Sequence, residues 1–73
     1  MAEGLYNRLR QLRAERDLTQ AALAEAVGVS RKTVNTVENG VFTPSTTLAL
    51  RLAAALECRV EDIFSLTPLE QNP

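Results

Sequence analysis

The chain has 73 residues, of which 45% are hydrophobic and 23% are charged, so its composition is that of one small folded domain and excludes a disordered chain. It contains no histidine and a single cysteine, which excludes a histidine-containing zinc cluster and an intramolecular disulfide. The net charge is −1, so a nucleic-acid-binding surface would have to be a local patch on a weakly acidic body.

The first half of the chain predicts three short helices in succession. The first runs to about residue 16, because apolar residues recur at spacings of four and three: Leu5, Leu9 and Leu12. The second covers residues 20–27 between a Thr19 cap and Gly28, and its expected apolar face holds Ala22, Leu23, Ala26 and Val27. The third covers residues 31–38, follows a Ser30 cap and buries Val34 and Val37.

The second half predicts two more helices after a loop that starts at Asn39-Gly40. Ser45 can cap the fourth helix, whose expected inner stripe is Leu48, Leu52, Ala55 and Leu56. Val60, Ile63 and Phe64 fit a short fifth helix. Residues 66–73 contain two prolines and show no periodicity, which indicates an irregular tail. The pattern as a whole indicates an all-α chain of five helices.

The second helix, the turn at Gly28 and the third helix have the form of a helix-turn-helix unit. The outward face of the third helix carries four hydrogen-bond donors: Arg31, Lys32, Asn35 and Thr36. Its two cations stand at the helix N-terminus, where the helix dipole disfavours positive charge, so an anionic partner is indicated. DNA fits, because an α-helix enters the major groove, where Arg pairs with guanine and Asn with adenine. The alternative is a solvated helix face.

Short motifs run through nearly the whole chain in one register. They are Leu9-Arg10-Gln11-Leu12-Arg13, Leu18-Thr19-Gln20, Leu23-Ala24, Val27-Gly28-Val29-Ser30-Arg31, Glu38-Asn39-Gly40, Pro44-Ser45, Leu48-Ala49-Leu50-Arg51-Leu52-Ala53, Ala55-Leu56 and Val60-Glu61-Asp62-Ile63-Phe64. Over about residues 5–65 the sequence resembles the Cro/phage-repressor (XRE) family of helix-turn-helix DNA-binding proteins. The resemblance implies a five-helix, lambda-repressor-like domain over residues 5–65, between a flexible N-terminus (1–4) and a C-terminal tail (66–73).

The same resemblance implies a role for individual residues. The expected contacts to base edges are Arg31, Lys32, Asn35 and Thr36. The expected contacts to the DNA backbone are Gln20, Ser30, Thr33, Asn39 and Thr43, and Gln20 would also brace the third helix. Arg13 and Glu38 match a family pair that ties the first helix to the third, so we assign them to structure rather than to DNA contact.

Two departures from the family pattern stand out. The residue after Leu56 is usually glycine, which closes the fourth helix in a left-handed turn, but here it is Glu57. The loop at residues 41–43 holds Val41, Phe42 and Thr43, where relatives often place Lys or Arg. With fewer cations near the phosphates, affinity is expected to be modest or to depend on dimerisation.

A dimer is expected because a chain of this size has a small core, and the short stand-alone members that it resembles are often homodimers. The predicted interface residues are apolar residues that the helical stripes do not all use: Leu50, Phe64, Leu66 and Leu69. The tail at residues 66–73 would join this interface. In the alternative, a monomer folds some of these side chains back onto its own core.

Nothing in the sequence assembles a catalytic or metal-binding site, so no enzyme, cofactor, metal or small-molecule effector is expected. Glu61 and Asp62 are adjacent and do not face each other on a helix. Cys58 reads as a buried structural thiol rather than a redox sensor, and an unpaired cysteine fits a reducing compartment. Arginines stand where a signal peptide needs an apolar run, and the apolar runs fall short of the about 18 residues that span a bilayer. We expect a cytoplasmic protein that does not enter membranes.

The expected function is that of a sequence-specific transcriptional regulator, and more specifically a repressor. As a homodimer it would bind double-stranded DNA at an inverted-repeat operator through residues 31–38. The alternative is a protein-interaction module, such as an antitoxin-like XRE protein with secondary DNA binding. That alternative is the weaker one, because such proteins usually carry an extra partner-binding segment and little sequence follows Phe64.

Overall fold

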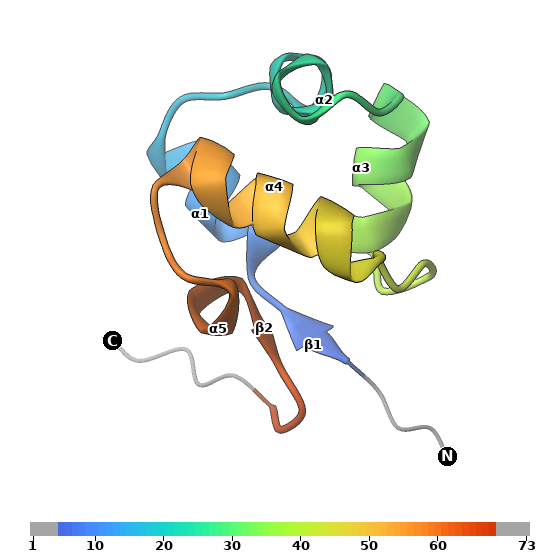
Figure 1. Ribbon diagram of the computed structural model, residues 1–73, viewed down its shortest axis with the longest axis vertical. Helices are drawn as coiled ribbons and strands as arrows, with labels where there is room; N and C mark the ends of the chain where they lie inside the picture. Colours follow the sequence, from blue (N-terminus) through green and yellow to red (C-terminus); the bar gives the residue numbers. More distant parts are fainter. Residues whose placement is uncertain (1–4, 69–73) are drawn as a thin grey trace.

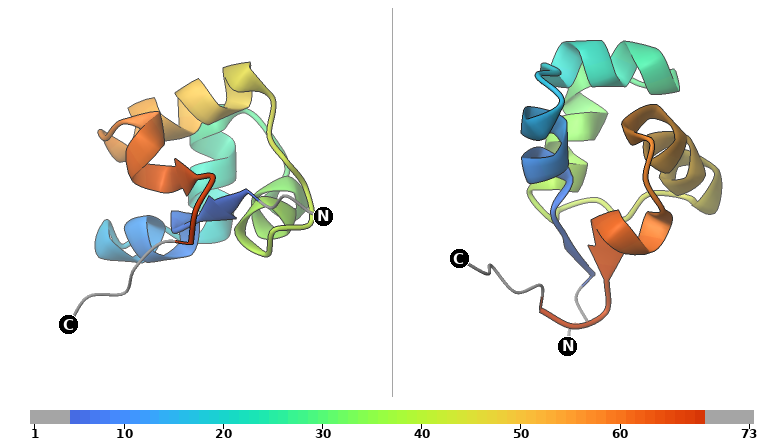
Figure 2. Two further views of the ribbon diagram at one scale, coloured as in Figure 1. Left: turned by 90° about the horizontal axis from the view of Figure 1, so that it is seen from below. Right: turned by 90° about the vertical axis from the view of Figure 1, so that its left-hand side faces the viewer.

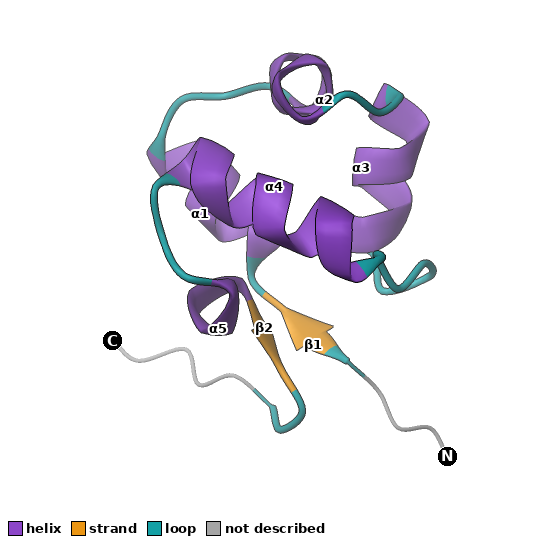
Figure 3. Cartoon of the chain, viewed as in Figure 1, coloured by secondary structure: helices purple, strands orange, loops and turns teal. Residues whose placement is uncertain are grey.

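The computed structural model describes residues 5–68, and within this range five helices are joined by one small sheet (Figures 1 and 3). The elements in order are β1 (Tyr6–Asn7), α1 (Leu9–Glu15), α2 (Gln20–Val27), α3 (Arg31–Glu38), α4 (Thr46–Leu56), α5 (Val60–Ile63) and β2 (Phe64–Ser65). The five expected helices are present, but the first begins only at Leu9, so Leu5, which was expected in its apolar stripe, precedes β1 instead. Between residues 5 and 68, no helix has both the length and the apolar character needed to cross a membrane.

Three helices begin where hydroxyl caps were predicted. The side-chain oxygens of Thr19, Ser30 and Ser45 accept hydrogen bonds from the backbone N–H three residues later, at 2.9, 3.1 and 3.1 Å. Each bond satisfies one backbone donor that the first turn of a helix leaves without a partner. These local bonds therefore fix the starts of α2, α3 and α4.

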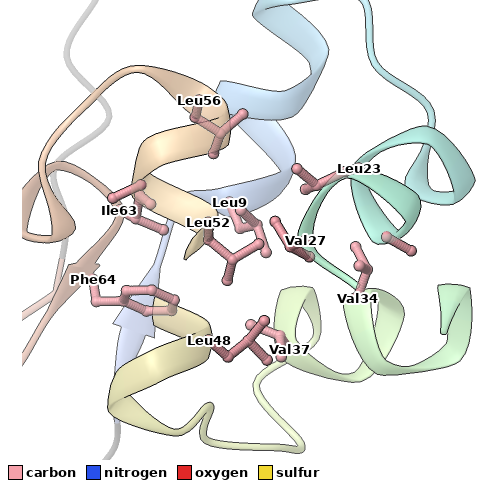
Figure 4. Packing of buried hydrophobic residues seen from close by; sticks show 12 residues of the cluster. Leu9, Leu23, Val27, Val34, Val37, Leu48, Leu52, Leu56, Ile63 and Phe64 are labelled. Carbon is pink, nitrogen blue, oxygen red and sulfur yellow. The ribbon is translucent and has the colours of Figure 1, made fainter. Parts of the chain in front are cut away.

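The core lies between α4 on one side and α1, α2 and α3 on the other (Figure 4). Its largest fully buried side chains are Leu9, Leu23, Leu52, Leu56, Ile63, Val34 and Val37. The predicted face of α2 was partly wrong, because Ala22 and Ala26 are exposed and Ala24 is buried. The helix contacts α3 and α4 along a stripe through Leu23, Ala24 and Val27, which lie on one side of a helix.

A two-stranded sheet was not expected from the sequence. β1 and β2 pair antiparallel, with Tyr6 opposite Ser65 and Asn7 opposite Phe64. Phe64, which was predicted to belong to the fifth helix, therefore lies in β2 directly after that helix ends. The backbone N–H of Arg8 also donates to the carbonyl of Ile63 at 2.9 Å, so the start of α1 is held against α5 (Figure 2).

The C-cap residues of α2 and α4 have left-handed backbone conformations. Gly28 closes α2 with φ of 79°, which glycine adopts without a steric penalty. Glu57 closes α4 with φ of 55° and ψ of 46°, so the chain makes the family's left-handed turn there without the usual glycine. Such a conformation costs a residue with a Cβ about 1–2 kcal/mol. This strain is a local property of the α4 terminus, away from α3.

Candidate nucleic-acid interface

The unit formed by α2, the turn and α3 presents α3 on the outside of the molecule. In Figure 1, α2 is seen nearly end-on while α3 runs down the right-hand side, so the two helices cross steeply. The turn is tied by a hydrogen bond of 3.0 Å from the Val29 N–H to the Ala24 carbonyl. Val34 and Val37 are buried on the inner side of α3, and the opposite side of the helix faces solvent.

Glu38, the last residue of α3, is the centre of a cluster of hydrogen bonds. Its side chain has no exposed surface, and its Oε2 lies 2.6 Å from Nε of Arg13. Its Oε1 accepts from Gln20 Nε2 at 2.9 Å and from Arg10 Nε at 3.4 Å. The ion pair that the sequence analysis expected between Arg13 and Glu38 is thus present, and α2 joins it through Gln20.

The pKa of the Glu38 carboxyl is shifted by opposing effects. Burial raises this pKa, while the hydrogen bonds from Arg13 and Gln20 and the charge of Arg13 lower it. The net result is a pKa below the ordinary value for a glutamate, so the carboxylate is ionised at neutral pH. An ionised Glu38 keeps α1, α2 and α3 together.

A second network of hydrogen-bonded polar side chains extends along the surface from α2 to the end of α3. Gln20 Nε2 donates to Asn35 Oδ1 at 3.1 Å, and Gln20 Oε1 accepts from Arg31 at 3.3 Å. Asn39 Nδ2 donates to the same Asn35 oxygen at 3.3 Å, and Arg10 donates to Asn39 Oδ1 at 2.9 Å. Gln20 therefore lies where it can brace α3, as the sequence analysis expected.

The four residues expected to contact bases lie on α3 but differ in exposure. Arg31 and Lys32 are exposed, whereas Asn35 and Thr36 are half-buried. The Asn35 oxygen already accepts two hydrogen bonds, and the Thr36 hydroxyl donates to the Thr33 carbonyl at 2.8 Å. The exposed donors of this face are thus Arg31, which also bonds to Gln20, and Lys32. A contact that uses the Asn35 oxygen would require its present bonds to rearrange, whereas both of these bonds leave the Asn35 amide nitrogen as a donor.

The residues expected to contact the DNA backbone surround this face. Ser30 and Thr33 share a hydrogen bond between their hydroxyls at 3.0 Å, at the first turn of α3. Asn39 is exposed at the other end of the helix, and Thr43 is exposed in the loop that follows. Together with Gln20, these residues border α3 at its start, at its end and on its α2 side.

Sequence reasoning missed two polar residues beside α3. Arg10 is 62% exposed at its side chain and joins α1 to the end of α3 through Glu38 and Asn39. Its spacing of three from Arg13 places both on one side of α1, which was an available signal. Asn7 donates to the Val37 carbonyl at 3.0 Å and accepts from the Leu9 N–H at 2.9 Å. No sequence signal indicated that contact.

The expected dimer residues are divided between surface and core. Leu50 is 57% and Leu66 is 81% exposed, but Phe64 is only 9% exposed and belongs to the chain's own core. The prediction for Phe64 therefore needs correction, because β2 turns its ring inward between α4 and the sheet (Figure 4). Leu69 lies outside the described residues. Leu50 and Phe64 are among the residues that line a surface hollow of about 500 Å³.

The chain is similar in sequence to known regulators. The helix-turn-helix family profile matches residues 9–63. The HTH-type transcriptional regulator YgzD of Bacillus subtilis is 42% identical over 62 residues, which cover 85% of this chain and 94% of that protein. An HTH-type transcriptional regulator of Methanothermobacter thermautotrophicus is 49% identical over 59 residues, which cover 80% of this chain and 86% of the relative.

Solved structures agree with this assignment. The restriction-modification controller protein C.AhdI of Aeromonas hydrophila superposes with a TM-score of 0.70 at 37% identity, over 74% of this chain and 78% of that one. The clp gene regulator ClgR of Corynebacterium glutamicum superposes with a TM-score of 0.71 at 35% identity, over 74% of this chain and 57% of that one. The chain belongs to the XRE-type helix-turn-helix family, a family of DNA-binding transcriptional regulators and not of enzymes.

Proposed function

We propose that this protein is a sequence-specific repressor that reads DNA through α3. The observation that carries the proposal is the exposed pair Arg31 and Lys32 at the first turn of a helix that Gln20 and Glu38 hold in place. Arg31 is suited to pair with a guanine in the major groove, and both cations can contact phosphates.

The placement of these cations supports a bound anion. The positive end of the α3 dipole lies at Arg31, and the first turn contains no acidic residue to offset it. In the free protein this arrangement is unfavourable by about 0.3–1 kcal/mol for each charge. DNA phosphates near the start of α3 would offset that cost, so the unfavourable charge placement in the free protein would become favourable in the complex.

The proposed binding unit is a homodimer on an inverted repeat. Leu50 and Leu66 are large apolar side chains left exposed to solvent, and a second copy would cover them. A two-fold dimer would place its two α3 helices about 34 Å apart, in successive major grooves. Binding at a promoter would then exclude polymerase, which is the basis for proposing a repressor.

DNA recognition is tested by selecting tight-binding duplexes from a random-sequence library with the full chain. Fluorescence anisotropy then compares the selected duplex with a scrambled one at low and high salt. Arg31→Ala should cost about 1–3 kcal/mol per half-site on the selected duplex and less on the scrambled one. Arg59→Ala removes the same charge from the residue that precedes α5 and should leave this preference intact. If no duplex is preferred over scrambled DNA, the proposal fails and capture of a protein partner becomes the next experiment.

The dimer is tested by sedimentation equilibrium at micromolar concentration. We expect a species of twice the chain mass, and Leu50→Glu should shift it toward the monomer by placing a charge in the interface. A single 8.0 kDa species for the unmodified chain would overturn the dimer. DNA binding would then be measured as that of a monomer on a half-site.

A further inference from the structure

The loop after α3 places apolar side chains directly beside the proposed DNA-reading face. Val41 is 78% and Phe42 is 47% exposed. With Lys32, Thr33 and Thr36 they line a surface hollow of about 310 Å³. We propose that this hollow receives the 5-methyl group of a thymine in the major groove, and that Phe42 and Val41 are specificity-determining residues. The inference rests on the proposed function and names one base that the site reads.

The hollow is fixed before any DNA binds. The backbone N–H groups of Val41 and Phe42 both donate to the Thr36 carbonyl, at 2.9 and 3.2 Å. The Gly40 N–H donates to the Val37 carbonyl at 3.0 Å, and a φ of 75° at Gly40 turns the chain back toward α3. The loop that emerges at the lower end of α3 in Figure 1 is thus attached to the helix.

Apart from Lys32, the walls of the hollow offer mainly apolar contact. The Thr36 hydroxyl donates to the Thr33 carbonyl, and the Thr33 hydroxyl is paired with that of Ser30. The Thr36 hydroxyl uses its donor within α3 and the Thr33 hydroxyl is paired with the N-cap Ser30, so the methyl groups of both threonines are available for apolar contact with a ligand. The other walls are the Val41 side chain and the Phe42 ring. Thymine is the base that presents a methyl group in the major groove, so it complements this surface.

Lys32 provides a second contact that can distinguish thymine from cytosine at the hollow. Its side chain borders the hollow and is exposed. Thymine carries the O4 acceptor next to its methyl group, so a lysine ammonium beside the hollow can donate to that oxygen. Cytosine presents an amino donor there and no methyl group. The apolar walls and Lys32 therefore favour thymine over cytosine by two independent contacts.

The test uses the full chain and the duplex selected from the random library. Each thymine is replaced in turn by deoxyuridine, which removes the methyl group and leaves base pairing unchanged. At one position in each half-site, affinity should fall about fourfold, the effect of one buried methyl-sized group. In Phe42→Ala the same replacement should have little effect, whereas Phe42→Leu should keep the discrimination because it refills the hollow. Circular dichroism confirms that both variants fold.

The outcomes separate this inference from the proposed function. A selected duplex that depends on Arg31 but tolerates deoxyuridine everywhere overturns the methyl pocket and leaves sequence-specific binding in place. A deoxyuridine effect of equal size in Phe42→Ala also overturns it, because another residue then reads the methyl group. Failure to select any preferred duplex overturns both proposals together.

Discussion

Arg13 and Glu38 form an ion pair across the first and third helices, with Nε of Arg13 2.6 Å from Oε2 of Glu38. The Arg13 side chain is 15% exposed and that of Glu38 is fully buried, so the pair is largely removed from water. Arg13 also donates to the Leu18 carbonyl at 2.7 Å, between α1 and α2. Through this pair, the orientation of the proposed reading helix depends on residues that do not face DNA.

Replacing Glu38 by glutamine should destabilise the protein strongly. The Arg13 guanidinium would then be left without a counter-charge in a poorly solvated position, which typically costs about 3–5 kcal/mol. Urea unfolding followed by circular dichroism gives the change in the free energy of unfolding. Glu25→Gln is the matched control, because Glu25 is exposed on α2, and it should change this free energy little. Equal effects of the two substitutions would contradict the role of the ion pair.

The lowered pKa of Glu38 predicts a loss of stability in acid. Because the pKa is lower in the folded than in the unfolded state, the stabilisation is complete above the unfolded value of about 4.3. It is lost as the pH falls through the folded value. Melting temperatures measured from neutral to acidic pH should therefore decline below about pH 4.3, and less steeply in Glu38→Gln. An identical decline in both proteins would contradict this assignment. The pKa of Asp62 is also lowered, chiefly by the hydrogen bond from the Arg59 backbone N–H. Asp62 is therefore expected to account for part of the decline in melting temperature that remains in Glu38→Gln.

The helix starts could be predicted from the sequence, whereas the sheet could not. A Ser or Thr side chain that accepts from the backbone N–H three residues later marks a helix start within a short stretch of sequence, as at Thr19 and Ser45. The strand pair joins Tyr6 and Asn7 to residues nearly sixty positions away, and two-residue strands are too short to show alternation. The face of α2 was misassigned because alanines lie on both its buried and its exposed sides, so they do not mark the face that packs.

The charged start of α3 was also predictable, because helical spacing separates Arg31 and Lys32 from the buried Val34 and Val37. The amide network was not. Gln and Asn side chains both donate and accept, so their partners depend on how closely α2 and α3 approach each other. In the structure Asn35 accepts a bond from Gln20 on another helix, and no spacing rule specifies that pairing. Its bond from Asn39, four residues further along, does follow helical spacing.

Gln20 and Asn35 should be energetically coupled. The hydrogen bond of 3.1 Å between them links α2 to α3, and removing either side chain breaks it. In a double-mutant cycle of Gln20→Ala and Asn35→Ala, we expect a coupling energy of about 0.5–1.5 kcal/mol in the free energy of unfolding. The pair Gln20→Ala and Thr47→Ala serves as the control, because Thr47 is exposed on α4 and forms none of the hydrogen bonds of this network. Additive effects for the first pair would show that the bond contributes nothing.

Glu57→Gly should stabilise the protein. Glu57 has φ of 55°, and glycine adopts this conformation without the cost of about 1–2 kcal/mol. The substitution also removes an exposed ion pair with Arg16 at 3.4 Å, but such pairs contribute little. The net gain expected in urea unfolding is about 1 kcal/mol. Glu57→Ala removes the same ion pair and keeps the strain, so it should give no gain. A gain in both variants would indicate that the charge, not the backbone, was responsible.

Cys58 should react slowly with a disulfide reagent in the folded protein. Burial raises the pKa of its thiol, and the negative charge of Asp62 raises it further, while Arg16 partly opposes these effects. A raised pKa leaves less thiolate at neutral pH, and the thiolate is the reactive form. The rate of thiol modification, followed by absorbance, should therefore be well below the rate in urea. Asp62→Asn should raise the native rate, because it removes a charge that disfavours the thiolate. Equal rates in native buffer and urea would indicate a reactive thiol and would argue against a purely structural role for Cys58.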